Sequence, residues 1–227
     1  MKNVYLINAS PRKQGSSAAM LTSFADGVRD VIPSEKDCLL HRIDLYDLSY
    51  QGCRECFLCR RKDSPYYGHC GYPDSIRDLL DAIAHSDGIA IAAPIYFHNI
   101  PGELRSFLER LLYPFISYPV GGRTCLAPKA IPVTMIYTMN VMEREMWAKQ
   151  YRVYLESVEN WLRFVFRIEP EIVYAFNTYQ FADYEKYEAG AWDLAFKTLW
   201  KDTQFPADRR MAFAAGQRMG KRNQQQL

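Results

Sequence analysis

The sequence has no long apolar run and almost no surplus of charge. No stretch approaches the roughly 20 apolar residues that cross a bilayer, and the apolar start at residues 4–7 is too short for the core of a signal peptide. The 28 Lys and Arg residues face 26 Asp and Glu residues, which is too small an excess for the basic surface that binds a phosphate backbone. We therefore expect a cytoplasmic protein with neither nucleic-acid nor membrane partners.

Two common nucleotide-binding motifs are missing as well. The sequence contains neither the glycine-rich dinucleotide fingerprint nor the P-loop with its lysine. These absences argue against a classical NAD-binding fold and against an ATPase. What is there is a chain of 227 residues, 48% of them hydrophobic and 24% charged, and this composition is typical of a globular protein.

Short apolar segments alternate along the chain with stripes of helical spacing. The expected strands are at 2–8, 39–45, 88–93, 130–138 and 172–176. Helical stripes separate them, including a long one from 147 to 162, and two last helices are expected at about 185–201 and 207–219. Because parallel strands need helical crossovers, this order predicts a single doubly wound α/β domain over residues 1–220, with a polar tail at 221–227.

In an open sheet of this kind, ligands bind outside the carboxyl ends of the strands. The loop after the first strand, residues 8–17, offers hydroxyls, backbone N–H groups, a helix N-terminus and the cations Arg12 and Lys13. These groups suit a phosphate dianion, and the absence of a dinucleotide motif favours a monophosphate. The alternative is a serine-rich helix cap whose two cations are simply solvated.

The loop after the third strand, residues 93–102, reads Ala-Pro-Ile-Tyr-Phe-His-Asn-Ile-Pro-Gly. It presents two aromatic side chains and an amide immediately before a helix. Together with Ser10-Pro11-Arg12, it resembles the flavodoxin-like family of NAD(P)H-dependent FMN reductases and iron-sulfur flavoproteins, over residues 2–140. The resemblance implies a flavodoxin-like five-stranded parallel sheet in the order 2-1-3-4-5, with helices on both faces.

The same resemblance implies which residues bind FMN. By position in the motifs, the phosphate would be held by Ser10, Arg12, Ser16 and Ser17. The isoalloxazine ring would be covered by Pro94, Ile95, Tyr96, Phe97 and Asn99. The exit of the fourth strand matches a third flavin loop only in its position and in Thr138, and a structural turn is the alternative there.

Four of the six cysteines lie in the segment 49–72, where no periodicity is visible. Cys53-x-x-Cys56-x-x-Cys59 followed by Cys70 is similar to the motif by which iron-sulfur flavoproteins hold a four-iron cluster. In a chain without an export signal, this spacing favours a metal or a cluster over disulfides. The gap before the fourth cysteine is wider than the family usually shows. The basic residues that crowd the site are Arg54, Arg60, Arg61 and Lys62. A 4Fe-4S cluster, a zinc ion and metal-free cysteines are therefore all open readings.

The resulting hypothesis is an FMN-dependent oxidoreductase that takes reducing equivalents from NAD(P)H. They would pass through the flavin, and through a 4Fe-4S cluster if one is held, to a quinone, flavin or protein acceptor. No catalytic side chain is required, because the flavin carries the chemistry. The alternatives are a non-enzymatic electron carrier of the flavodoxin type and a zinc-stabilised binding module on the same fold. The resemblance also implies a homodimer or homotetramer.

Overall fold

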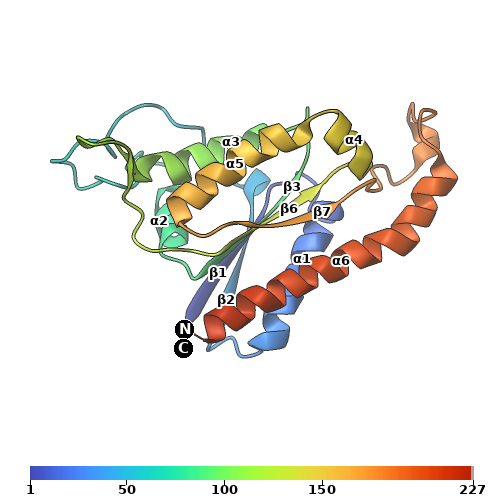
Figure 1. The fold of residues 1–227 in the computed structure, drawn as a ribbon, viewed down its shortest axis with the longest axis horizontal. Coiled ribbons are helices and arrows are strands. Elements are labelled where there is room, and N and C mark those ends of the chain that lie inside the picture. The colour runs from blue at the N-terminus through green and yellow to red at the C-terminus, as the bar shows by residue number, and fades with distance from the viewer. Residues whose placement is uncertain (226–227) are drawn as a thin grey trace.

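Five parallel strands form the central sheet of the computed structural model, which describes residues 1–225 (Figure 1). Their bounds are β1 Lys2–Asn8, β2 Cys38–Asp44, β3 Gly88–Pro94, β6 Val133–Thr138 and β7 Glu171–Ala175. Their spatial order is β2-β1-β3-β6-β7. Since β6 and β7 are the fourth and fifth strands of the sheet, the predicted order 2-1-3-4-5 is confirmed. A separate antiparallel hairpin is formed by β4 (Ile116–Ser117) and β5 (Thr124–Cys125).

Helices cover both faces of this sheet. Their bounds are α1 Ser16–Val31, α2 Arg77–Ala84, α3 Gly102–Leu112, α4 Glu143–Ala148, α5 Tyr151–Phe166 and α6 Leu194–Gln224, with 3-10 turns at Leu45–Asp47, Tyr113–Phe115 and Tyr184–Lys186. Successive strand residues point to opposite faces, so Val4 and Ala90 pack with α1 and α6 while Ile7 and Ile91 pack with α2, α3 and α5. In residues 1–225, no helix is both long and apolar enough to span a membrane.

Two helical predictions are wrong in detail. The stripe from 147 to 162 belongs to two helices, because the left-handed backbone of Gln150 (φ 58°) separates α4 from α5. In place of the helices expected at about 185–201 and 207–219 there is one helix, α6, which begins only at Leu194, runs through Pro206 and takes in residues 221–224 of the predicted tail. Residues 226–227 of that tail lie outside the described part of the chain.

Close contact with α1 explains why α6 continues past its proline. A Cβ atom on Gly27 would lie 2.0 Å from the carbonyl oxygen of Phe213, and one on Gly216 would lie 2.0 Å from that of Phe24. Only glycine permits such an approach of two backbones. Packing along α1 therefore holds the later turns of α6, and the earlier turns reach the N-terminal end of α1.

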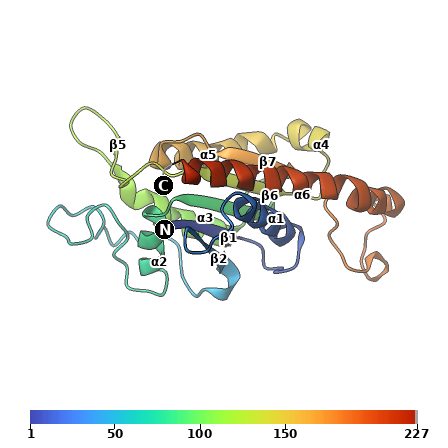
Figure 2. The same cartoon turned by 90° about the horizontal axis from the view of Figure 1, so that it is seen from below.

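The long irregular segments lie at opposite ends of the molecule. Segment 49–72 and the β4–β5 hairpin project from one end, and segment 176–193 projects from the other (Figure 2). Segment 49–72 contains neither helix nor strand. The cysteines and the carboxyl edge of the sheet are therefore two separate places in the fold, and α3 runs between them (Figure 1).

Candidate functional site

Three strand ends meet at the carboxyl edge of the sheet, as the sequence predicts. The backbone N–H of Ile95, just after β3, donates to the carbonyl oxygen of Thr138 at the end of β6 (3.0 Å). The hydroxyl of Thr138 lies 2.7 Å from that of Ser17 in the first turn of α1. Ser17 and Thr138 are both buried. Their hydrogen bond joins the loops after β1, β3 and β6 into one surface.

The N-terminus of α1 has backbone donors without side-chain partners. Its N-cap is Gly15, which supplies no acceptor, and no acidic residue lies in the first turn. Buried Ser10 accepts a hydrogen bond from the backbone N–H of Arg12 (3.2 Å) and so shapes the loop before the helix. Free N–H groups and the helix dipole favour an anion here. The residues present therefore fit a phosphate group.

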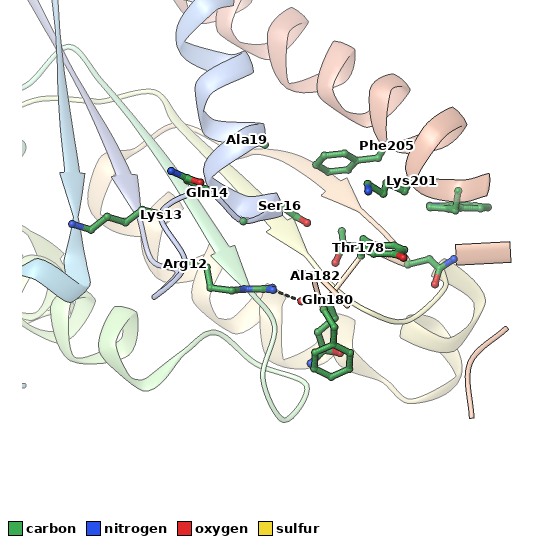
Figure 3. A pocket seen from close by; sticks show the side chains of 15 residues that line it. Arg12, Lys13, Gln14, Ser16, Ala19, Thr178, Gln180, Ala182, Lys201 and Phe205 are labelled. Carbon is green, nitrogen blue, oxygen red and sulfur yellow. Dashed lines mark hydrogen bonds between the residues drawn. The ribbon is translucent and has the colours of Figure 1, made fainter. Parts of the chain in front are cut away.

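A cavity of about 610 Å³ opens beside this end of α1 (Figure 3). Arg12 and Ser16 line it, and the Arg12 guanidinium donates across it to the carbonyl oxygen of Gln180. Its walls are residues 12–16 with Ala19, residues 177–182, and Trp200, Lys201 and Phe205 of α6. The sequence reasoning missed the second and third walls. The position of residues 177–182 directly after the fifth strand could have pointed to the second.

The loop after β3 forms a tight turn with an exposed aromatic tip. Tyr96 and Asn99 pair through both backbone hydrogen bonds (2.8 and 2.9 Å), with Phe97 and His98 between them. Both central residues have positive φ (48° and 67°), a conformation that L side chains rarely adopt. Phe97 consequently stands fully in solvent, while His98 stacks on Tyr151 with 4.1 Å between ring centroids.

The structure thus divides the predicted flavin residues between two surfaces. Arg12 and Ser16 line the 610 Å³ cavity, with Ser10 buried beneath their loop. The ring-covering residues 94–99 do not line that cavity, although Ile95 is joined to the loop of α1 through Thr138. The phosphate prediction and the ring prediction therefore fall on adjoining surfaces of the same sheet edge.

A buried lysine supports the third loop of this edge. Lys197 of α6 is 2% exposed, and its Nζ donates to the side-chain oxygens of Asn140 (2.5 Å) and Asn177 (2.8 Å) and to the carbonyl oxygen of Thr178 (3.4 Å). Burial lowers the pKa of Lys197 to about 8. Lys197 thereby ties the segment after β6 to the segment after β7. No sequence pattern points to Lys197, because a single lysine in a polar helix is common.

All four predicted metal ligands line one small cavity at the far end of α3. Cys53, Cys56, Cys59 and Cys70 contribute to its wall, and all four are free cysteines. The backbone turns between them because Glu55 and Phe57 have positive φ (51° and 56°). Burial raises the pKa of the Cys59 thiol, and the charge of Arg60 opposes this shift. The three closely spaced cysteines and the more distant Cys70, which differ in burial, are thus brought to one place.

The four thiols do not form a preformed metal site. Among residues 1–225, no group of three or more His, Cys, Asp and Glu side chains is arranged to hold a metal ion. Zinc takes four ligands in a tetrahedron, and a four-iron cluster takes one thiolate at each of its irons. Four cysteines around one cavity fit the donor set of the cluster in number and in chemistry.

Arg110 of α3 holds the cysteine segment in place. It is 2% exposed, and its guanidinium forms a bidentate ion pair with Asp74 (2.7 and 3.0 Å). The same group donates to the sulfur of Cys70 (3.0 Å) and to the carbonyl oxygen of Gln51 (3.1 Å). Its hydrogen bonds hold the pKa of Asp74 below the ordinary value, against the effect of burial. Sequence analysis placed other basic residues at this site and missed Arg110.

The basic residues that the sequence placed around the cysteines behave differently from one another. Arg54 lines the cysteine cavity. Arg60 instead donates to the carbonyl oxygen of Tyr113 (2.9 Å) and lies over its ring, and Arg61 pairs with Asp63 (2.8 Å). Two of the four predicted basic residues, Arg60 and Arg61, therefore have partners of their own beside the cysteines.

Comparison with known proteins gives three kinds of match. The family model described as NADPH-dependent FMN reductase matches residues 2–140. An iron-sulfur flavoprotein of Clostridioides difficile is 30% identical over 118 residues, which are 48% of this chain and 49% of the relative. An iron-sulfur flavoprotein of Archaeoglobus fulgidus is 27% identical over 129 residues, 57% of this chain and 51% of the relative. The chain thus matches about half the length of these curated relatives.

Solved structures share the fold over almost the whole chain. An azoreductase from Bacillus anthracis superposes with a TM-score of 0.67 at 15% identity, covering 96% of this chain and all of the other. An NAD(P)H:quinone oxidoreductase from Methanothermobacter marburgensis has the same TM-score and identity, covering 95% and 98%. A B. anthracis NADH-azoreductase in complex with FMN gives 0.65 at 14% identity, covering 93% and 98%. At these identities the likeness shows the flavodoxin-like fold.

Proposed function

Since this chain belongs to the NADPH-dependent FMN reductase family, we propose that it is an FMN-dependent oxidoreductase. It takes reducing equivalents from NAD(P)H and passes them to a quinone, flavin or protein acceptor. The observation that carries the proposal is the uncapped N-terminus of α1, which faces a cavity together with Arg12 and Ser16. An anion site at the carboxyl edge of such a sheet is where a nucleotide binds.

Each predicted residue has a role that its position supports. The N–H groups of the first turn of α1, with Ser16 and Arg12, bind the phosphate, and buried Ser10 and Ser17 hold that loop in shape. Tyr96 and Phe97, which are exposed in the turn after β3, cover one face of the ring. When bound, FMN supplies the hydride and electron chemistry, so the protein's contribution is to bind, orient and exclude water.

We propose further that Cys53, Cys56, Cys59 and Cys70 hold a 4Fe-4S cluster. Support comes from their arrangement around one cavity and from the names of the two relatives. Such a cluster exchanges one electron at a time. Gly102 and Arg110 stand near the two ends of α3, so the cysteine site lies roughly 12 Å of helix away from the ring-binding turn.

An assembly of two or four copies is a further proposal. Phe97, Trp147 and Tyr154 are each at least half exposed, and exposed aromatic residues favour contact surfaces. Light scattering coupled to size exclusion measures the molar mass directly. A mass of one chain, 26.4 kDa, would reject it.

One set of measurements on anaerobically purified protein tests the function. Absorbance, flavin extraction and analysis of iron, sulfide and zinc identify what is bound, and NAD(P)H oxidation is followed with a quinone and with ferricyanide. We expect FMN, about four iron atoms per chain, and turnover. Bound FMN without turnover would favour the electron carrier. One zinc ion without flavin would favour the binding module.

A further inference from the structure

The 610 Å³ cavity offers more room than a phosphate group fills. Its volume lies in the range of about 300–1,000 Å³ that is typical of small-molecule sites. The residues predicted to cover the flavin ring, 94–99, do not line it. It extends instead from the loop before α1 toward α6, so that Lys201 and Phe205 stand across from Ser16 (Figure 3). Part of the cavity therefore lies beyond the loop before α1, on the side of α6, and residues 94–99 do not line it.

The α6 side of the cavity combines aromatic surface with a cation. Trp200 and Phe205 line it from α6, and Tyr179 lines it from the segment after β7. The indole N–H of Trp200 donates to the carbonyl oxygen of Phe176 (2.9 Å), which fixes the orientation of its ring. The Nζ of Lys201 lies 4.6 Å from the ring centroid of Tyr179, and within residues 1–225 it forms no ion pair. Flat faces beside a free cation suit a base and a phosphate.

A buried amide in the wall has an unused donor. Asn177 is 6% exposed, lines the cavity, and has a left-handed backbone (φ 47°). Its Oδ1 accepts from Lys197, but its Nδ2 has no hydrogen-bond partner in the described chain. A buried polar group without a partner is costly. A ligand acceptor that reaches this wall after a small shift would satisfy it.

We infer that the α6 side of this cavity is a subsite for the adenylate half of a dinucleotide. The base stacks against Trp200 and Phe205, and Lys201 pairs with the phosphate. Arg12 and Ser16 line the same cavity as Lys201, and the two phosphates of a dinucleotide would meet beside them. The inference rests on the proposed function, because the loop of α1 must hold the flavin phosphate. The adenylate can belong to FAD or to the nicotinamide dinucleotide, and the experiment separates these sources.

The test compares ligands that differ only in the adenylate. Flavin-free protein is titrated with FMN and with FAD by flavin fluorescence, and both the flavin-free and the FMN-loaded protein are titrated with ADP-ribose by calorimetry. Lys201→Met, at an exposed position, removes the cation. Lys221→Met, on the same helix outside the cavity, is the matched control.

If the adenylate belongs to FAD, FAD should bind about tenfold more tightly than FMN. Lys201→Met should weaken FAD binding about fivefold and leave FMN binding unchanged, because only a charge-assisted contact to the second phosphate is lost. Lys221→Met should change neither. If FAD and FMN bind equally while ADP-ribose binds the FMN-loaded protein in a Lys201-dependent way, the adenylate belongs to the nicotinamide dinucleotide.

Two results have distinct meanings. The subsite is rejected if FAD binds no better than FMN and ADP-ribose binds neither form, or if Lys201→Met alters no affinity. If neither flavin binds, the proposed function fails, and ADP-ribose binding to the flavin-free protein then decides the subsite alone.

Discussion

The loop before α1 and the loop that carries the cysteines are ordered in different ways, although each is expected to hold a cofactor. Residues 8–17 are fixed by the sheet: the backbone N–H of Ala9 donates to Ala92 (2.8 Å) and Ser17 is tied to Thr138. Residues 49–72 have no regular structure and are held by hydrogen bonds of side chains, among them those that the buried guanidinium of Arg110 donates. A sheet edge presents a site wherever its strands end, whereas the cysteine site depends on individual side chains.

The largest expected effect comes from Arg110→Ala. This substitution leaves the carboxylate of Asp74 without a partner, and the side chain of Asp74 is only 16% exposed. Breaking such a buried pair costs about 3–5 kcal/mol of the free energy of unfolding, because one charge stays buried and unpaired. Urea unfolding measures this loss. The iron content should fall with it, since Cys70 and Gln51 lose their anchor.

Arg105→Ala is the matched control on the same helix. Its side chain is 59% exposed and pairs with Glu109 at 3.7 Å, an interaction worth about 1 kcal/mol at most. Hydrogen exchange should show that Arg110→Ala exposes residues 49–72 and leaves residues 8–17 protected. Equal exposure of both loops would contradict the contrast between them.

The pH dependence of stability probes the sheet-edge side of the comparison. Because the pKa of Lys197 is about 8 in the folded protein and about 10.4 when unfolded, the unfolded state binds more protons between these values. The free energy of unfolding should therefore rise through this window. The rise should be about 3 kcal/mol, because a shift of one pKa unit corresponds to about 1.36 kcal/mol. Below pH 8 the cost of the buried charge is fully present.

Lys197→Met isolates that contribution, because other groups titrate in the same window. The free energy of unfolding is measured in urea from pH 7 to pH 10.5 for the wild type and for Lys197→Met. It should rise with pH in the wild type relative to Lys197→Met. Lys201→Met, which removes an exposed lysine of the same helix, should leave this rise in place. A parallel pH profile for wild type and Lys197→Met would show that Lys197 is not the group responsible.

Gly216→Ala breaks the contact between α6 and α1 on which the cavity wall depends. The new Cβ would lie 2.0 Å from the carbonyl oxygen of Phe24, and backbone atoms cannot move aside as a flexible side chain can. We expect about 3 kcal/mol of destabilisation, at the upper end for overpacking. Gly190→Ala has no atom within 4 Å of its Cβ and should change stability little. If Gly216→Ala kept wild-type stability, the close contact between α1 and α6 would not contribute to stability as we propose.

The sheet could be predicted because its apolar segments are short and bounded by turns. The continuous apolar run of β3 predicts a central strand, and the loops after β1, β3 and β6 meet because parallel strands share one carboxyl edge. The helix boundaries were harder to predict from the sequence. Gln150 in a left-handed conformation is not a residue that sequence marks as a break, and the glycines of the contact between α1 and α6 act across a distance in sequence.

Contacts between distant residues account for what the sequence could not supply at the sites. The cysteine spacing predicted which thiols would gather, but Arg110 lies 40 residues from Cys70 and carries no motif. Likewise Lys197 lies 57 residues from Asn140. Local patterns report on elements, and these side chains act between elements, so only the folded arrangement reveals them.

The smallest effect is expected from Arg12→Ala, and it separates binding from stability. Loss of a charge-assisted hydrogen bond to the phosphate should weaken FMN binding by about 2 kcal/mol, roughly thirtyfold. Unfolding should hardly change, because the one hydrogen bond that the guanidinium forms within residues 1–225, to Gln180, is exposed. Lys13→Ala is the control, since Lys13 is paired with Asp47 (2.6 Å) and should affect FMN less. Equal losses from both variants would indicate a diffuse positive surface, and unchanged affinity in Arg12→Ala would remove Arg12 from the site.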